Sequence, residues 1–210
     1  SLNASTLYLG DNSTLTLGDA GTVRAAIISL TDHSEVYLDH SLTLDSGSTV
    51  GGDPGLSALY IDHHAVGDVA IDSYDSINAR SVNIRGSNSS LTLESGATIT
   101  GNVSLGNGSH LNLSDSSSVI GTIDSINDSG GALGISGNVT SHGNIGNSVR
   151  LGSVTLEDVA VLDLSEHDNS LNAASVTLGD GSVLYVGSGE ITGSFVGGTN
   201  STINFNKDNI

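Results

Sequence analysis

The fold is decided by residues 82–102, which read VNIRGSNSSLTLESGATITGN. Two apolar–polar–apolar triplets stand in this stretch, Val82-Asn83-Ile84 and Leu91-Thr92-Leu93, and a third apolar position follows at Ile99. Alternation with a period of two sends one set of side chains inward and the other outward, as in a β-strand. Glycine, serine and asparagine between the triplets are typical corner residues. The stretch therefore predicts three short strands joined by tight turns.

The same unit recurs along the chain in three columns. We predict that successive strands of the first column start at Leu15, Val36, Leu59, Val82 and Val103. Those of the second column start at Leu42, Val69, Leu91 and Leu111, and the third column has its inward positions at Val50, Ile77, Ile99 and Val119. Three strands per coil of about 20–23 residues predict an all-β fold, a right-handed three-sided parallel β-helix or β-solenoid. An antiparallel sandwich is the structural alternative, because it also has many short strands. Two triplets followed by a third strand favour the solenoid.

The repeat is regular as far as Val119, irregular between Gly121 and Gly152, and regular again from Val154. Within the irregular middle we expect four inward positions, at Ile123, Leu133, Val139 and Ile145. No linker separates the parts, so residues 1–210 are predicted to form a single β-helix domain.

Composition excludes several classes of function. The chain has 5 basic and 23 acidic residues, a formal charge of −18, and no clustered Lys or Arg that could neutralise phosphate. We therefore expect no nucleic acid partner. No apolar run approaches the roughly 20 residues that a membrane-spanning helix needs, so no membrane insertion of this segment is expected. Cysteine is absent; an oxidising compartment permits disulfides without requiring them, and a protein that crosses a membrane unfolded is also suited by their absence.

Residues 82–102, together with residues 175–194, which read SVTLGDGSVLYVGSGEITGS, resemble the passenger repeats of bacterial autotransporter adhesins, the type V secreted proteins of the self-associating or diffuse-adherence kind. The resemblance extends from about Leu7 to Phe205. It implies export through the outer membrane, an extracellular position on the bacterial cell surface, and a role in adhesion, aggregation, biofilm formation and virulence. The implied partner is another copy on a neighbouring cell, or a host surface protein or glycan. The sequence would then be a fragment or processed part of a longer secreted passenger.

Two other functions fit a β-helix. One is the structural stalk of a larger autotransporter such as a secreted serine protease, although the Gly-Asp-Ser-Gly motif of that branch is absent. The other is a carbohydrate-active enzyme, in which outward acids such as Asp163 and Glu94 would pair across coils. Basic residues are rare and no nucleophile elbow places a serine beside a histidine. We therefore expect no enzyme activity, no catalytic residues and no cofactor.

We expect contacts with a partner molecule in the loops that make a coil longer than the repeat. They contain Asp53, Pro54, Asp62, His63, His64, Asp68 and Asp72. His33 and His40 lie one coil earlier. Adjacent histidines on a strand point to opposite faces, so surface histidines on an insertion are favoured over a metal site. The outward column of Thr16, Thr43, Thr92, Thr155 and Thr177 forms a polar ladder suited to self-association or glycan contact. We expect function where the coils depart from the repeat, in residues 51–72 and in the irregular middle.

Overall fold

The computed structural model describes residues 76–87, 89–165 and 169–205, and before them eight short strands. These eight are Leu7–Leu9 (β1), Leu15–Leu17 (β2), Thr22–Val23 (β3), Glu35–Leu38 (β4), Leu42–Leu44 (β5), Thr49–Val50 (β6), Ala58–Ile61 (β7) and Asp68–Ile71 (β8). The later strands are Ser76–Ile84 (β9), Ser90–Leu93 (β10), Thr98–Leu105 (β11), His110–Leu113 (β12), Ser118–Ile120 (β13), Ile123–Ser125 (β14), Ala132–Ile135 (β15), Asn138–Thr140 (β16), Leu151–Leu156 (β17), Val161–Asp163 (β18), Leu171–Leu178 (β19), Val183–Val186 (β20), Ile191–Gly197 (β21) and Thr202–Phe205 (β22). This described part contains strands and turns and no helix.

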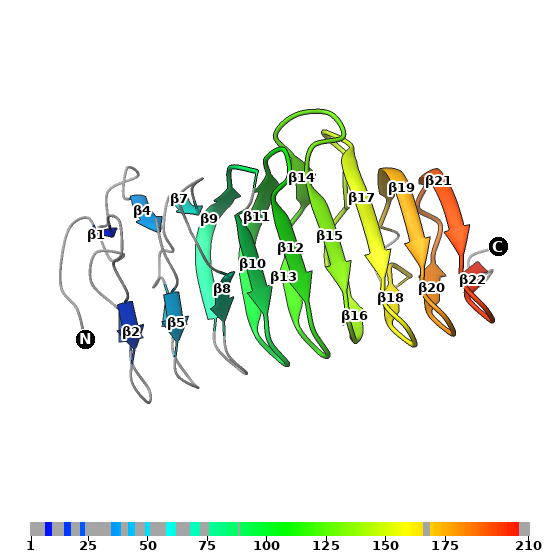
Figure 1. Ribbon diagram of the computed structural model, residues 1–210, viewed down its shortest axis with the longest axis horizontal. Coiled ribbons are helices and arrows are strands. Elements are labelled where there is room, and N and C mark those ends of the chain that lie inside the picture. The colour runs from blue at the N-terminus through cyan, green and yellow to red at the C-terminus, as the bar shows by residue number, and fades with distance from the viewer. Residues whose placement is uncertain are drawn as a thin grey trace.

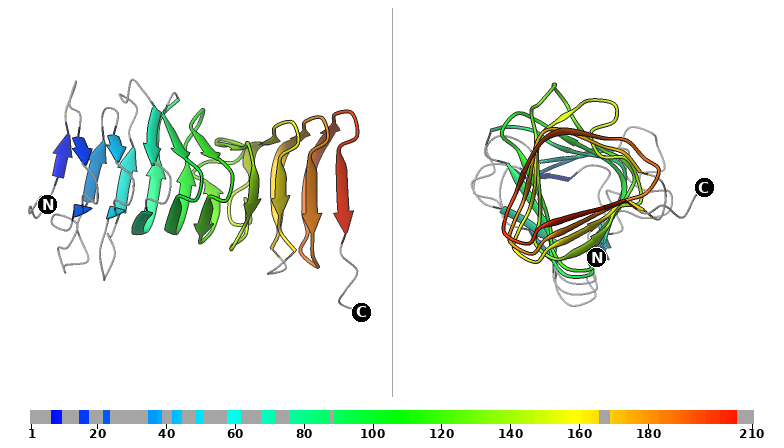
Figure 2. Two further views of the ribbon diagram at one scale, coloured as in Figure 1. Left: turned by 90° about the horizontal axis from the view of Figure 1, so that it is seen from below. Right: turned by 90° about the vertical axis from the view of Figure 1, so that its right-hand side faces the viewer.

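Each strand pairs in parallel with strands of the neighbouring coils, so the chain winds into a rod (Figure 1). The register steps from Leu91 to Leu111, then to Leu133, then to Val154 are 20, 22 and 21 residues. Seen along the rod, the coils superpose in a three-sided outline (Figure 2). The prediction of a three-sided parallel β-helix is confirmed, with about 21 residues per turn.

The rod has three faces, which we name by their strands. The first face contains β1, β4, β7, β14 and the C-terminal halves of β9 and β11. The second face is one sheet of nine strands in the order β2-β5-β8-β10-β12-β15-β17-β19-β21. The third face contains β3, β6, β13 and the N-terminal halves of β9 and β11, and continues as a separate sheet of β16, β18, β20 and β22.

Inward aliphatic side chains from the three faces stack into the core. The buried residues of the first face include Leu59, Val82, Val103, Ile123, Ile145 and Leu171, those of the second Leu91, Leu111, Leu133, Val154 and Val176, and those of the third Ile77, Ile99, Val119, Val139, Leu162 and Leu184. Each fully buried side chain of this size stabilises the fold by about 1.5–3 kcal/mol. The four inward positions predicted in the irregular middle, among them Val139, are all buried, so that prediction is confirmed.

One assignment in the columns is wrong. The strand Leu15–Leu17 was expected in the first column, but it pairs with Leu42–Leu44 and belongs to the second face. The first face begins with β1, whose Leu7 is the register partner of Val36. A step of 21 residues from Leu15 to Val36 happens to match the repeat, and this coincidence hid the earlier triplet Leu7-Tyr8-Leu9.

Tight turns join the second face to the third. Their closing hydrogen bonds run from the N–H of the fourth residue to the carbonyl of the first, in Glu94–Ala97, Ser114–Ser117, Glu157–Ala160, Gly179–Ser182 and Gly198–Ser201. The third residue of each turn has a positive φ, and these residues are Gly96, Ser116, Val159, Gly181 and Asn200. Aspartates at these corners cap the next coil: the Oδ1 of Asp158 accepts the N–H of Asp180 at 2.9 Å. Part of the acidity of the chain therefore has a structural role in the turns.

Candidate ligand-binding hollow on the third face

The third face is interrupted between β13 and β16. Within the described residues no ladder pairing joins these two strands, although β16 pairs normally with β18 on its other side. The second face continues without a break at the same level, because β12 pairs with β15 and β15 with β17. The interruption is therefore local to one side of the rod.

Loop lengths in the coil of β16 explain the interruption. From the second face to the third, the regular coils span six positions, as in Leu93 to Ile99, Leu113 to Val119, Leu156 to Leu162 and Leu178 to Leu184, whereas Ile135 to Val139 spans four. At the next corner the balance is reversed. Val119 to Ile123 spans four positions, and Val139 to Ile145 spans six. The later coils also have a long second corner, with nine positions from Leu162 to Leu171, so the short corner before Val139 is what sets this coil apart and shifts β16 out of register with β13.

Hydrogen bonds show where the displaced strand is attached. The backbone N–H of Asn138 donates to the Oδ1 of Asp115 at 3.0 Å, and the N–H of Ser116 donates to the carbonyl of Asn138 at 2.8 Å. Both partners lie in the turn before β13 and not in β13 itself. Gly137 makes this approach possible, since a Cβ atom at that position would lie 2.5 Å from the backbone nitrogen of Asp115.

The two additional corner residues are Ser141 and His142. Ser141 is buried, its hydroxyl lies 2.6 Å from the carbonyl oxygen of Gly143, and its own carbonyl accepts the side-chain amide of Asn169 at 2.8 Å. His142 is exposed. Of the two inserted residues, Ser141 therefore points inward and connects two coils through Asn169, and the imidazole of His142 lies at the surface.

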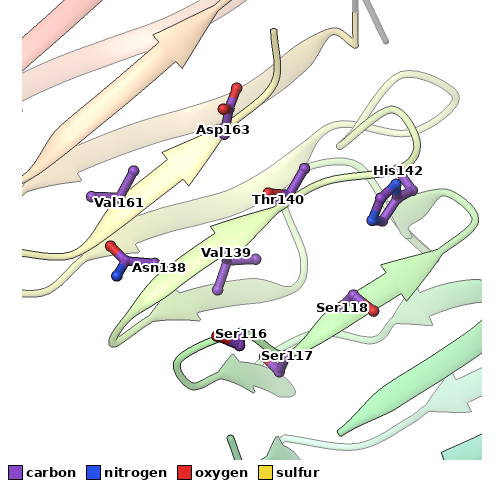
Figure 3. A pocket seen from close by; sticks show the side chains of 9 residues that line it. All are labelled: Ser116, Ser117, Ser118, Asn138, Val139, Thr140, His142, Val161 and Asp163. Atoms are coloured by element: carbon purple, nitrogen blue, oxygen red, sulfur yellow. The ribbon is translucent and has the colours of Figure 1, made fainter. Parts of the chain in front are cut away.

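Beside the shortened corner lies an open hollow of about 520 Å³ on the third face. Figure 3 shows the side chains that line it: Ser116, Ser117, Ser118, Asn138, Val139, Thr140, His142, Val161 and Asp163. They come from the turn before β13, from β13, from β16 with its following corner, and from β18. Small-ligand sites typically occupy about 300–1,000 Å³, so the hollow has the size of such a site.

The lining is rich in groups that can both donate and accept hydrogen bonds. The Ser117 hydroxyl donates to the carbonyl of Ser114 at 2.7 Å, and the Ser118 hydroxyl lies 3.4 Å from that of Thr98. The side-chain amide of Asn138 and the hydroxyl of Thr140 make no hydrogen bond to any other described residue. These two side chains, on the displaced strand, are therefore available to a ligand.

Charged groups in the hollow are few. The lining includes one carboxylate, Asp163, and contains neither Lys nor Arg. The Oδ1 of Asp163 accepts the hydroxyl of Ser165 at 2.6 Å and its N–H at 2.8 Å. The third serine hydroxyl of the lining, that of Ser116, lies 3.3 Å from the Oδ2 of Asp115, so all three serine hydroxyls and Asp163 have partners within the chain.

A second hollow lies beside the corner between the second and third faces. It is more open, measures about 410 Å³, and is lined by Thr155, Leu156, Glu157, Asp158, Thr177 and Gly179. Asp158 already caps the following coil here. The hollow beside β16 has the richer set of available polar groups, so we take it as the candidate site.

The predicted contact residues lie outside the described side chains. Asp53, Pro54, Asp62, His63, His64 and Asp72, with His33 and His40, are not among the described residues, and Asp68 is described only as the first residue of β8. Asp163 and Glu94, named above as examples of outward acids, do not pair with each other. These residues stand three coils apart, about 14 Å along the rod at one strand spacing per coil. Over the described ranges no group of three or more His, Asp or Glu side chains is placed to hold a metal ion.

The hollow lies at the border of the irregular middle, which contributes Asn138, Val139, Thr140 and His142 to its lining, while the regular coils on both sides contribute the rest. The sequence did not indicate the residues, since Ser, Thr and Asn are common throughout the chain. The signal that could have found them is the four-position spacing from Ile135 to Val139, where every neighbouring coil has six.

Comparisons with known proteins add no family to this picture. A scan against protein-family models and searches of curated proteins and of solved structures found no match. Among the described residues there is also no helix with the length and hydropathy needed to cross a bilayer.

Proposed function

We propose that this chain is an extracellular adhesion module, the β-solenoid passenger segment of an autotransporter-type surface protein. Its regular coils form a rod, and the rod carries a recognition site for a partner on another surface. The observation that supports the proposal best is the polar hollow of about 520 Å³ at the displaced strand β16. A rod that served only as a spacer would have no need to interrupt a face in this way.

The outward polar residues of the second face give the proposal a second support. Thr16 is the register partner of Thr43, Thr155 is the partner of Thr177, and the Asn112 side chain lies 3.4 Å from the hydroxyl of Thr92. Among the side chains that the structure describes, Thr92, Asn112, Thr155 and Thr177 give this face a row of partly or fully exposed polar groups. Such a surface tolerates water and makes many weak contacts, which suits reversible adhesion between cells.

The test uses the whole chain displayed on non-adherent bacteria or coated on beads. Thr140→Trp fills the hollow from an outward position of β16, and Thr100→Trp places the same side chain in a regular coil of the same face. Self-association is measured by sedimentation of a single population, and adhesion to a partner surface is measured on cultured epithelial cells. We expect wild type and Thr100→Trp to bind in one of these assays and Thr140→Trp to lose most of that binding.

Two results would contradict the proposal. If the displayed wild-type chain neither sediments cells nor attaches to the epithelial surface, a structural stalk is the better interpretation. If Thr140→Trp and Thr100→Trp both bind like wild type, the hollow has no part in adhesion. Circular dichroism of both variants confirms that each retains its β-structure before the assays are compared.

A further inference from the structure

We propose that the hollow at β16 binds a neutral saccharide unit, an inference that rests on the proposed adhesive role and specifies its ligand. The first argument is the kind of polar group present. Ser116, Ser118 and Thr140 contribute hydroxyls and Asn138 contributes an amide, and each of these groups both donates and accepts hydrogen bonds. Sugar hydroxyls have the same dual character, so donor and acceptor roles can be matched around a ring.

Charge determines which saccharides fit. Capture of a sulfated, phosphorylated or carboxylated sugar relies on Arg or Lys, which form the strong charge-assisted hydrogen bonds. The hollow contains neither, and Asp163 borders it. The formal charge of −18 on the whole chain adds a long-range repulsion of anions. An uncharged sugar meets no such repulsion.

An apolar contact is present beside the polar groups. Val161 is partly exposed on β18, lines the hollow, and stands beside Asn138, its register partner on the paired strand β16 (Figure 3). A pyranose ring presents hydroxyls at its edge and C–H groups on its face. The Val161 methyl groups can cover such a C–H face while Asn138 and Thr140 bind the ring edge.

A peptide strand is a poorer occupant. An extended peptide would bind by adding a strand between β13 and β16, which requires two strand spacings between them. The coils are held at one strand spacing by the continuous pairing of β12 with β15 on the second face. The turn before β13 also remains bonded to Asn138. There is consequently no room for another strand.

The experiment measures binding of methyl glucoside, methyl galactoside and methyl N-acetylglucosaminide to the whole chain by ligand-observed and protein-observed NMR. N-acetylneuraminic acid and glucose 6-sulfate serve as the anionic probes. We expect at least one neutral glycoside to bind and to shift the side-chain amide resonances of Asn138. Asn138→Ala should weaken that binding about tenfold, the effect of losing one or two hydrogen bonds to the ligand.

Two further variants control for folding. Thr140→Val keeps the shape of a β-branched side chain and removes one hydroxyl, so it should also weaken binding several-fold. Thr100→Val makes the same change in a regular coil and should leave binding unchanged. Equal thermal unfolding midpoints for the three variants and the wild type show that the fold is retained.

The inference is overturned if no neutral glycoside binds, if the anionic probes bind more tightly, or if Asn138→Ala and Thr140→Val bind like wild type. Its failure is distinct from failure of the adhesive role. If Thr140→Trp abolishes adhesion but no saccharide binds, the saccharide proposal fails and the adhesion proposal stands. If a saccharide binds but the displayed chain does not adhere, the adhesion proposal fails and the saccharide proposal stands.

Discussion

Residues 76–120 and residues 121–150 belong to one rod but are held together differently. In the first region β9 and β11 each run through the corner between the third and first faces and pair over most of their length. In the second region the first face is reduced to β14 and to single bridges from Ile123 to Ile145 and from Ile145 to Leu171, while the third face is interrupted. Ile123, Val139 and Ile145 nevertheless stay buried. The core and the hydrogen-bonded ladders are therefore separable features of this fold.

Side chains replace the missing ladder bonds in the second region. The Oδ1 of Asp124 accepts the backbone N–H of Ser148 at 2.9 Å, and the Oδ1 of Asn144 accepts that of Ser170 at 2.8 Å. These side-chain hydrogen bonds connect one coil to the next, as backbone hydrogen bonds do in the regular coils. A coil can thus depart from the repeat, and form a hollow, as long as its inward residues keep their places and its polar backbone groups find other partners.

The largest effect is expected from core truncation in the two regions. Leu91 and Leu133 stand in the same column of the second face, Leu91 in the regular region and Leu133 in the irregular one, and both are buried. Leu91→Ala and Leu133→Ala should each lower the free energy of unfolding by about 2–5 kcal/mol, because each leaves a cavity in a stacked core. Urea denaturation followed by circular dichroism measures both changes. A cost for Leu133→Ala far below that for Leu91→Ala would show that the core is not continuous through residues 121–150.

The sequence predicts the core of this fold better than it predicts the hollow. Inward positions such as Leu111 and Val139 were predictable, because burial requires an apolar side chain at every second residue of a strand. Strand pairing was not predictable in the same way. The wrong column for Leu15 and the unforeseen interruption beside β16 both concern which strand lies next to which, and that depends on corner lengths. Polar residues such as Asn138 and Thr140 carry no periodic signal, so only the short spacing before Val139 marked the site.

An intermediate effect is expected in the turns that join the second and third faces. Val159 has a φ of 56° and is 76% exposed, whereas the same turn position is Gly96 in a regular coil and Gly181 in a later one. A β-branched side chain in this left-handed conformation costs roughly 1–2 kcal/mol. Val159→Gly should therefore raise the free energy of unfolding by about 1 kcal/mol, which a shift in the urea midpoint would report.

The reciprocal change is the control for that turn. Gly181 also has a positive φ, of 68°, and a Cβ atom there would meet only the Val159 side chain at 3.5 Å. Gly181→Val should accordingly be destabilising through its backbone conformation and not through overlap. If Val159→Gly leaves the urea midpoint unchanged, the turn at Val159 is not strained.

The smallest effect is expected from the ion pair at the edge of the irregular region. Arg150 Nη2 lies 3.1 Å from Asp128 Oδ2, with side chains 41% and 70% exposed. Solvent screens a pair of this kind, so Asp128→Asn should change the free energy of unfolding by no more than about 0.5 kcal/mol. Molar salt should remove even that difference. A larger and salt-insensitive loss would mean that this corner depends on Asp128 as the other corners of the region depend on their aspartates.

Under the proposed adhesive role, the unbroken second face has a mechanical consequence. When a bound partner pulls along the axis, tension passes from coil to coil through the strand ladders. Over residues 76–120 three ladders share this load, but around β16 the strand pairing of the second face is the continuous path. The level of the hollow has fewer continuous strand ladders than residues 76–120, so we expect stretching to open it before those coils. A partner held there would be released by force at the site itself, with the rest of the rod still wound.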